Sequence, residues 1–293
     1  MSKSKKVVFF GSGPVAAASL ALLASNFAIE AVITKPKPSH HRGEVPVLEV
    51  AKRLGLPVFA AANKQELDEL FAKKPAKSEL AILIDFGIIV SRKIIDYFQL
   101  GIINSHFSIL PEWRGADPIT FAVLGGQTTT GVSLMLLVEA MDEGPLLAYG
   151  EYEMPADTTT PLLTQELIKL SQALLVETVP KYIAGELQPV AQSKTGREVS
   201  YSRKLVKADG MVDFGKPARQ IEREVRAYQP WPKSQAKIFD HDVIITRARV
   251  AIDKGDGDLV ISCQPGWLEV QELTAPSGRT MSGADFLRGY RRT

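Results

Sequence analysis

Apolar runs of five or six residues alternate with segments of helical spacing through the first part of the chain. The runs at 6–10 and 29–34 flank an alanine- and leucine-rich stretch at 15–25, which predicts a strand, a helix and a second, parallel strand. A crossover of this kind is right-handed in nearly all proteins. The uninterrupted apolar run at 80–84 is typical of a parallel strand covered on both faces. This pattern predicts an α/β fold, a Rossmann-like domain with a mostly parallel sheet.

Two further strands are expected at 131–138 and 146–154, and the loop between them carries Asp142. Three threonines followed by Pro161 then mark the start of a helix, because proline is favoured at the first helical position. Leucines at helical spacing extend this helix to near Gly185, and it is expected to pack on the sheet.

The last third of the chain has a different pattern. Polar residues fill 188–202, which is predicted to be a linker, and a strand at 211–214 and a helix at 217–227 are expected after it. Short apolar strands separated by turn residues follow. Four or five such strands with one helix predict a small OB-like β-barrel, an architecture that commonly binds nucleic acid. The expected domains are therefore 1–187, with the Rossmann-like sheet, and 203–293, with the barrel.

Composition limits the class of protein. Of the 293 residues, 45% are hydrophobic and 23% charged, as in ordinary globular proteins. No uncharged apolar stretch reaches the roughly 20 residues that cross a bilayer. The single cysteine, Cys263, excludes an internal disulfide and a cysteine-based zinc site, and suits a cytoplasmic protein. His40 and His41 stand without a third ligand nearby, so no metal is expected.

Charge is distributed unevenly along the chain. Residues 1–187 carry 17 Lys and Arg against 20 Asp and Glu, whereas residues 188–293 carry 18 against 13. Basic residues supply sequence-independent affinity for phosphates, so a polyanionic partner of the C-terminal part is one interpretation. A solvated basic surface is the other. Arg247 and Arg249 are two apart on an expected strand and are therefore expected on one face.

The turn after the first strand keeps a second function open. Gly11-x-Gly13-x-x-Ala16 resembles the looser form of a dinucleotide-binding fingerprint, as in an NADP-dependent Rossmann oxidoreductase. That fingerprint expects an acidic residue at the end of the second strand. Glu30 lies at the start of that strand instead, and lysines follow its end. NAD is therefore disfavoured, and NADP stays an alternative.

The strongest candidate site lies in the stretch Leu100 to Gly115. If 101–106 is a strand, Asn104 and His106 share a face and project from its carboxyl end, where α/β proteins bind ligands. With Asp142 they supply an amide, an imidazole and a carboxylate, and no serine or cysteine has the surroundings of an activated nucleophile. This set suits direct transfer of an acyl group to an amine, since an oxyanion needs donors and protons must move between two nitrogens.

These residues resemble those of the 10-formyltetrahydrofolate-dependent formyltransferases. The family's Asn-x-His and Ser-Leu-Leu-Pro signature is similar to Asn104 to Pro111 together with Trp113-Arg114-Gly115, and its aspartate loop is similar to Met141-Asp142-Glu143-Gly144. The branch that acts on initiator methionyl-tRNA has a second domain that resembles YSRKLVKADGMVDF, EREVRAYQPWP and LEVQELTAPSGRTMSGADFLRG. The resemblance covers nearly the whole chain.

The resemblance implies transfer of a formyl group from 10-formyltetrahydrofolate to the α-amine of initiator methionyl-tRNA, for translation initiation. Asn104 and His106 would donate hydrogen bonds to the oxyanion, and Asp142 would orient His106 and assist proton transfer. Either His106 or Asp142 takes the amine proton. A formyltransferase acting on an amino-sugar nucleotide or a purine precursor is the alternative, and a monomer is expected.

The resemblance also implies binding residues. The folate is expected at the end of the 80–84 strand and at the signature, at Asp85, Phe86, Gly87, Ile88, Ser108, Leu110 and Pro111. The tRNA is expected at the basic loop after the second strand and on the second domain, at Lys35, Lys37, Arg42, Arg247 and Arg249. The family pattern differs at three places, where Thr-Pro, Ala-Tyr and a proline are replaced by Ser12-Gly13, Asp85-Phe86 and Ser91.

Overall fold

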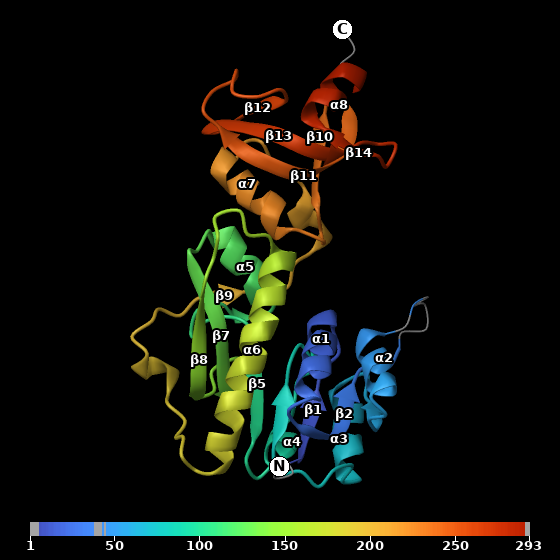
Figure 1. Ribbon diagram of the computed structural model, residues 1–293, viewed down its shortest axis with the longest axis vertical. Coiled ribbons are helices and arrows are strands. Elements are labelled where there is room, and N and C mark those ends of the chain that lie inside the picture. Colours follow the sequence, from blue (N-terminus) through green and yellow to red (C-terminus); the bar gives the residue numbers. More distant parts are fainter. Residues whose placement is uncertain (1–5, 38–42, 44, 291–293) are drawn as a thin grey trace. The chain divides into compact units, whose positions relative to one another are not determined.

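The computed structural model of the chain describes residues 6–37, 43 and 45–290 (Figure 1). These residues form two compact units, each made of several chain segments. The first unit spans Met1–Arg114, Gly131–Tyr152 and Gln165–Tyr201, and the second spans Gly115–Thr130, Glu153–Thr164 and Ser202–Thr293. Most of the polar segment 188–202 therefore packs within the first unit.

A seven-stranded sheet lies mainly in the first unit, in the order β3-β2-β1-β4-β5-β7-β8. Neighbours from β3 to β5 run parallel, and β5 pairs with β7 antiparallel. The strands are β1 (Lys6–Phe10), β2 (Ala28–Thr34), β3 (Val58–Ala60), β4 (Ala81–Leu83), β5 (Ile102–His106), β7 (Thr129–Leu136) and β8 (Leu146–Glu153). The predicted mostly parallel sheet is confirmed. Its order reverses between β1 and β4, and open sheets of this type bind ligands outside the carboxyl ends of such strands.

Alternating side chains on β1 show how both faces of the sheet are covered. Phe10 packs in an aromatic cluster, with its ring centroid 5.7 Å from that of Phe71 and 6.0 Å from that of Phe98. Phe9 points to the other face, beside Gly11 and Ala16 of the first helix. The helices around this sheet are α1 (Pro14–Leu23), α2 (Pro46–Arg53), α3 (Lys64–Ala72), α4 (Arg92–Ile95) and α6 (Thr160–Ile183).

The long helix α6, yellow-green in Figure 1, packs on β5 and β8. Ser171 Oγ of α6 lies 2.7 Å from Ser105 Oγ of β5. A Cβ at Gly150 of β8 would lie 2.9 Å from the Leu170 side chain, so glycine lets the helix approach closely. Because successive strand residues point to opposite faces, the residues on either side of Ser105 turn away from α6.

The second unit contains an antiparallel sheet in the order β10-β11-β13-β12, with β14 on β13. Its apolar face packs on Ile221 and Val225 of α7 and on Phe286 of α8. The elements are α5 (Pro118–Gly125), α7 (Ala218–Ala227), β10 (Ser234–Ile238), β11 (His241–Ala251), β12 (Val260–Cys263), β13 (Gly266–Thr274), β14 (Thr280–Ser282) and α8 (Gly283–Tyr290). The prediction of a small OB-like β-domain is confirmed as a curled, barrel-like sheet.

The described chain also contains shorter elements. Two 3₁₀ turns lie at Gln192–Lys194 and Lys207–Gly210, and a two-stranded sheet pairs β6 (Arg114–Gly115) with β9 (Tyr201–Ser202).

The prediction of a strand at 211–214 is wrong. Met211 makes one isolated bridge with Gln235, and Asp213 Oδ1 accepts a hydrogen bond from the Gly215 N–H at 2.8 Å. An aspartate side chain that binds the backbone two residues on favours a turn, and this local hydrogen bond competes with the strand.

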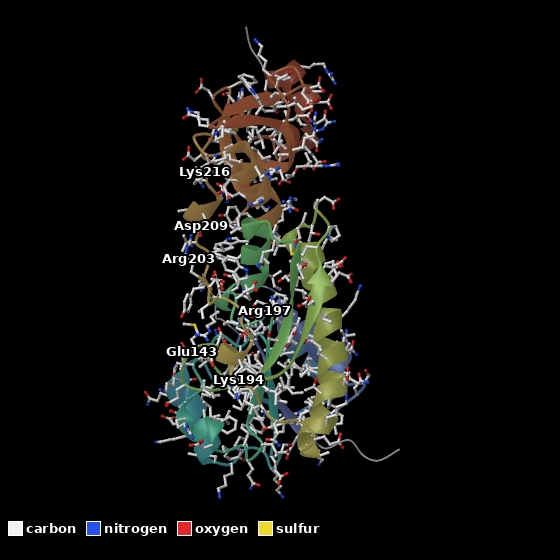
Figure 2. All side chains as sticks on the ribbon, turned by 90° about the vertical axis from the view of Figure 1, so that its left-hand side faces the viewer. Glu143, Lys194, Arg197, Arg203, Asp209 and Lys216 are labelled. Carbon is white, nitrogen blue, oxygen red and sulfur yellow. The ribbon has the colours of Figure 1, made fainter. Side chains whose placement is uncertain are left out.

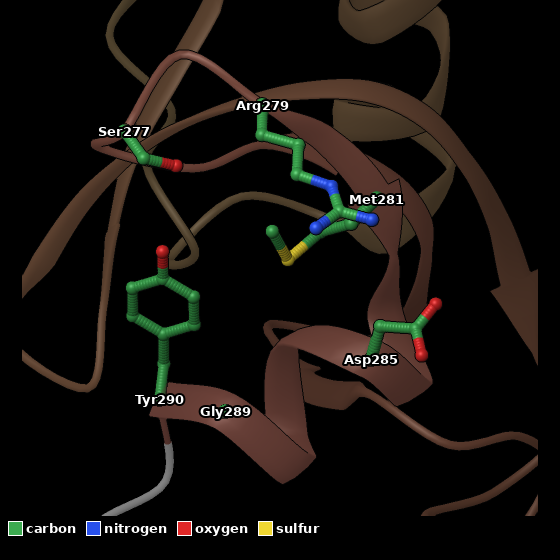
Figure 3. Close-up of a pocket in the computed structure, with 6 residues that line it drawn as sticks. All are labelled: Ser277, Arg279, Met281, Asp285, Gly289 and Tyr290. Atoms are coloured by element: carbon green, nitrogen blue, oxygen red, sulfur yellow. The ribbon is translucent and has the colours of Figure 1, made fainter.

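A shallow pocket of about 590 Å³ lies beside α8 in the second unit (Figure 3). Figure 3 shows Arg279 and the hydroxyl of Tyr290 at its sides. Its carboxylate, Asp285, already accepts hydrogen bonds from Ser282 and Arg288. The pocket therefore lacks the acid–base set of the predicted site. Among the described residues, none of the helices combines the length and the apolar character of a membrane span.

Candidate active site

The carboxyl end of β5 places Asn104 and His106 on one side of the sheet. Both side chains are buried, with 7% and 6% of their surface exposed. Asp142 comes from the loop between β7 and β8 and reaches the same place, since its carboxylate contacts both of the other side chains. The structure thus brings together the three residues predicted to be catalytic.

His106 has different partners at its two ring nitrogens. Nε2 lies 2.9 Å from the carbonyl oxygen of Trp113, which only accepts hydrogen bonds, so Nε2 carries a proton and donates it. Nδ1 lies 3.8 Å from Asp142 Oδ1, beyond hydrogen-bond length. In the neutral ring Nδ1 is an acceptor, and it faces a carboxylate, which is also an acceptor. A proton that arrives between these two atoms satisfies both.

Asn104 completes the group from the same strand face. Its Nδ2 donates to Asp142 Oδ1 across 3.4 Å, which is long for a hydrogen bond. Asp142 Oδ1 therefore lies between an amide and an imidazole at distances that leave both contacts weak. A substrate oxygen that approaches at hydrogen-bond distance can compete for the Asn104 amide.

The backbone of the aspartate loop is unusual. Asp142 has φ of 54°, in the left-handed region, which aspartate tolerates better than most residues because its short polar side chain can bind locally. A Cβ at Gly144 would lie 1.7 Å from the Leu136 carbonyl oxygen at the end of β7, so the glycine of this motif lets the loop press against the sheet. Sparsely populated backbone conformations of this kind cluster at functional sites.

Two buried serines fix the turn that follows His106. Ser133 Oγ accepts from the Leu110 N–H at 2.9 Å and donates to the Ser108 carbonyl at 2.8 Å, and Ser108 Oγ donates to the Glu112 carbonyl. The side chains of Ser108, Leu110 and Pro111, which were expected to bind the folate, are all buried in this turn. In this structure they form the core of the turn between His106 and Trp113.

Trp113 follows this turn with φ of 53°, which is rare for a bulky side chain. Its N–H donates to Ser200 Oγ at 2.9 Å, and its carbonyl accepts from His106 Nε2. The left-handed backbone at Trp113 therefore aims a carbonyl at the imidazole, and Ser200 holds that backbone in place.

The segment after β4 was also expected to bind the folate. Asp85 and Gly87 are exposed and have φ of 49° and 60°, whereas Ile88 is partly buried. Ser12 Oγ donates to the carbonyls of Asp85 and Phe86, at 3.2 and 2.8 Å. Asp85 and Gly87 are therefore the residues of this segment open to solvent, whereas Phe86 is buried.

Gly13 does not form an open cradle for phosphate. A Cβ at Gly13 would lie 1.8 Å from Asp85 Oδ2, so a carboxylate fills the space that the glycine leaves. A carboxylate repels a pyrophosphate, and Glu30 instead binds the backbone N–H groups of Lys77 and Ser78 at 3.0 and 2.8 Å. Gly13 and Asp85, two of the departures from the family pattern, thus form one matched contact, and the NADP alternative loses its structural support.

The residues expected to bind tRNA are placed differently from one another. Arg42 lies outside the described residues. Lys35 is partly buried and Lys37 is exposed, just after β2, and Arg247 is exposed on β11. The β11–β13 register shifts on both sides of Arg247, which interrupts the alternation on which a shared face with Arg249 was predicted.

Arg249 is held by carboxylates. Its Nη1 lies 2.8 Å from Asp256 and its Nε 2.5 Å from Glu269. The Arg249 guanidinium, together with the Ile252 N–H, lowers the pKa of the Asp256 carboxyl to about 2. This ion pair therefore contributes stability at neutral pH that is lost only as the pH falls from about 4 towards 2.

Among the described residues, no group of three or more His, Cys, Asp or Glu side chains is arranged to hold a metal. One further polar residue at the site, Gln192, was not predicted. It contacts the aspartate loop from the segment expected to be a linker, and no sequence pattern distinguishes it from the other polar residues there.

Comparison with known proteins identifies the family. A family model described as formyl transferase matches residues 5–179, and one described as formyl transferase, C-terminal domain, matches residues 204–291. The chain belongs to the formyl transferase family. It is 37% identical to a methionyl-tRNA formyltransferase of Symbiobacterium thermophilum over 97% of this chain and 92% of that protein. It is 33% identical to the protein of the same name from Magnetococcus marinus, over 97% of this chain and 95% of that one.

Solved structures share the fold at lower identity. An N-formyltransferase of Helicobacter canadensis, in complex with folinic acid and dTDP-3-aminofucose, is 16% identical with a TM-score of 0.67, over 93% of this chain and 95% of that one. HypX of Aquifex aeolicus, in complex with tetrahydrofolic acid, has a TM-score of 0.63 at 16% identity, and this chain spans 48% of its length.

The hydrogen bond to Trp113 predicts the tautomer of His106. In protein with ¹⁵N-labelled histidine, the neutral form of His106 should show a protonated Nε2 and an unprotonated Nδ1. His241, which lies in the second unit with its ring packed on Tyr290, provides an internal reference. A neutral His106 with its proton on Nδ1 would contradict the arrangement.

Proposed function

We propose that this formyl transferase moves the formyl group of 10-formyltetrahydrofolate to the α-amine of initiator methionyl-tRNA. The observation that carries the proposal is the similarity to methionyl-tRNA formyltransferases along nearly the full length of both chains, the C-terminal domain included. We further propose that it works as a monomer in the cytoplasm, where initiator tRNA is charged.

The site offers a route for each proton. The neutral amine attacks the formyl carbon, a C–N bond forms, and the bond from that carbon to folate N10 breaks. His106 Nδ1 and Asp142 Oδ1 face each other as acceptors and together take the proton that the amine loses. The pair then returns a proton to N10, which leaves as an amine, so no proton is gained or lost overall.

Stabilisation of the oxyanion uses the same groups. As charge develops on the formyl oxygen, the Asn104 amide donates to it in place of its long contact with Asp142. Once His106 is protonated, its single Nδ1–H is shared between Asp142 Oδ1, 3.8 Å away, and the oxyanion, while Nε2 remains on Trp113. The amine proton thus creates the positive charge that the oxyanion needs.

The binding regions follow from placement and charge. The segment Asp85 to Ile88 lies at the carboxyl end of β4, next to β5 in the sheet, and exposes Asp85 and Gly87. It is the proposed folate site together with the turn that carries Ser108, Leu110 and Pro111. The proposed tRNA contacts are Lys35, Lys37, Arg42, Arg247 and Arg249. Of the two on β11, Arg247 is the stronger candidate because it presents its charge to solvent, whereas Arg249 must exchange its ion pairs with Asp256 and Glu269 for a phosphate.

A formylation assay tests the acceptor. With 10-formyltetrahydrofolate and charged initiator tRNA, we expect N-formylmethionyl-tRNA, and much less product with elongator methionyl-tRNA. An amino-sugar nucleotide and a purine precursor amine serve as competing acceptors. Product with one of these and none with methionyl-tRNA would contradict the proposed substrate while keeping the family's chemistry.

Substitutions in the site test the roles of its residues. Asn104→Ala should lower kcat by about 10² to 10³, the usual effect of losing one oxyanion donor, with KM changed far less. Asp142→Asn should lower kcat by about 10² to 10⁴, the usual effect of losing a group that takes part in proton transfer. Ser105→Ala is the matched control, because Ser105 lies between Asn104 and His106 but faces α6. It should cost about 1 kcal/mol of stability and leave kcat near that of the wild type. Near-normal turnover in both site variants would contradict the assignment.

A further inference from the structure

Gln192 is buried although it lies in a polar segment expected to link two domains. Only 4% of its surface is exposed. It begins the 3₁₀ turn Gln192–Lys194, just after Val190, which forms an isolated bridge with Leu146 at the start of β8. The segment therefore runs along the first unit beside the aspartate loop, and residue 192 points inward.

The side-chain amide of Gln192 uses its full hydrogen-bonding capacity. Nε2 donates to the carbonyls of Asp142 and Gly144, at 2.7 and 2.8 Å. Oε1 accepts from Arg114, at 3.2 Å from Nε and 2.9 Å from Nη2. Two donors and two acceptor positions are all that an amide has. Because carbonyls lie on one side and a guanidinium on the other, the amide fits in only one orientation.

The amide nitrogen and the amide oxygen of Gln192 are linked to different members of the proton-accepting pair, Asp142 and His106. The Nε2 group of Gln192 holds the backbone of Asp142, which is in the left-handed region. At Gly144 the same loop packs closely against the carbonyl of Leu136 at the end of β7. The amide oxygen of Gln192 holds Arg114, the residue after Trp113, whose carbonyl fixes His106. Arg114 Nη1 also reaches Glu143 of the same loop at 3.1 Å.

The rest of the segment strengthens this arrangement. Ser200 fixes the Trp113 backbone, and Arg197 lies 3.0 Å from Glu112 and 2.7 Å from Glu151. Figure 2 labels Arg197 and Lys194 on this segment and Glu143 on the aspartate loop. Within this segment, Gln192 donates directly to the backbone carbonyl of Asp142.

We infer that Gln192 is a positioning residue for formyl transfer: it sets the distance between Asp142 Oδ1 and His106 Nδ1 by joining the aspartate loop to the Trp113–Arg114 turn. It does not touch the reacting atoms. The inference rests on the proposed roles of Asp142 and His106, but it does not depend on which amine accepts the formyl group.

A double-mutant cycle with Asp142 tests the inference. Gln192→Met keeps the length of the side chain and removes its hydrogen bonds, so Asp142 should shift and kcat should fall about 10- to 100-fold, with KM for the folate nearly unchanged. In an Asp142→Asn background the same substitution should cost less than about threefold, because the carboxylate that it positions is already gone. Equal losses in both backgrounds would mean a general structural role and would overturn the inference, as would an unchanged kcat in the single variant.

A second variant guards against loss of the fold. Gln192→Glu keeps an acceptor for Arg114 but turns the donor side into a carboxylate that faces two carbonyl oxygens. This variant should remain folded, and its kcat should fall about as much as that of Gln192→Met. The loss should again be smaller in the Asp142→Asn background. A Gln192→Glu enzyme with wild-type kcat would overturn the inference. Gln188, which is exposed in the same segment, supplies matched controls in Gln188→Met and Gln188→Glu, both expected to retain wild-type kcat.

These assays use whichever amine the wild-type enzyme formylates. A wild type that is inactive with methionyl-tRNA but active with another amine would contradict only the proposed substrate. The cycle would then be run with that amine and would still decide the role of Gln192.

Discussion

The hydrogen bond from His106 Nε2 to the Trp113 carbonyl is the constraint on which the site depends. This bond engages Nε2 as a donor to the backbone, so the other ring nitrogen, Nδ1, faces Asp142. Without it the imidazole could turn or change tautomer, and Nδ1 could carry its proton before the amine arrives. In the proposed mechanism, this arrangement lets Nδ1 and Oδ1 accept a single proton at the carboxyl end of β5.

Other parts of the first unit keep His106 and the Trp113 carbonyl in this arrangement. Buried serines hold the turn between His106 and Trp113. Trp113 and Asp142 both adopt left-handed backbone, each stabilised by a contact from the segment that follows α6. The site thus draws on three stretches that are far apart in sequence, and its geometry is fixed only when all three have packed.

Much of the fold follows from local pattern. The parallel strands and the barrel strands are continuous apolar or alternating runs. Such strands can be predicted from sequence because the burial of one or both sheet faces determines where apolar residues occur. Helix α3 was missed although its signal is present: Asn63 accepts from the Glu66 N–H at 3.0 Å while Glu66 accepts from the Ala62 N–H, a reciprocal cap. The strand expected at 211–214 failed because a side-chain hydrogen bond of Asp213 outweighed a short apolar pattern.

The site was predictable to a different degree. Period two along β5 was sufficient to place Asn104 and His106 together. The loop between the strands expected at 131–138 and 146–154 pointed to Asp142, and the family's motif agreed. Gln192 could not be found, because its partners lie about 50 and 78 residues earlier and its neighbours are ordinary polar residues. The contact between Gly13 and Asp85 was likewise visible only as two separate departures from a pattern. Domain boundaries and the tRNA-binding residues stay predictions.

In the proposed mechanism the formyl group passes directly to the amine, with no covalent intermediate on the enzyme. Mixing the enzyme with formyl-labelled 10-formyltetrahydrofolate, quenching at short times and measuring the intact protein mass tests this most directly. The account predicts no labelled protein in the absence of acceptor, and label in the acceptor alone once methionyl-tRNA is added. A protein heavier by one formyl group that then passes its label to the acceptor would contradict it.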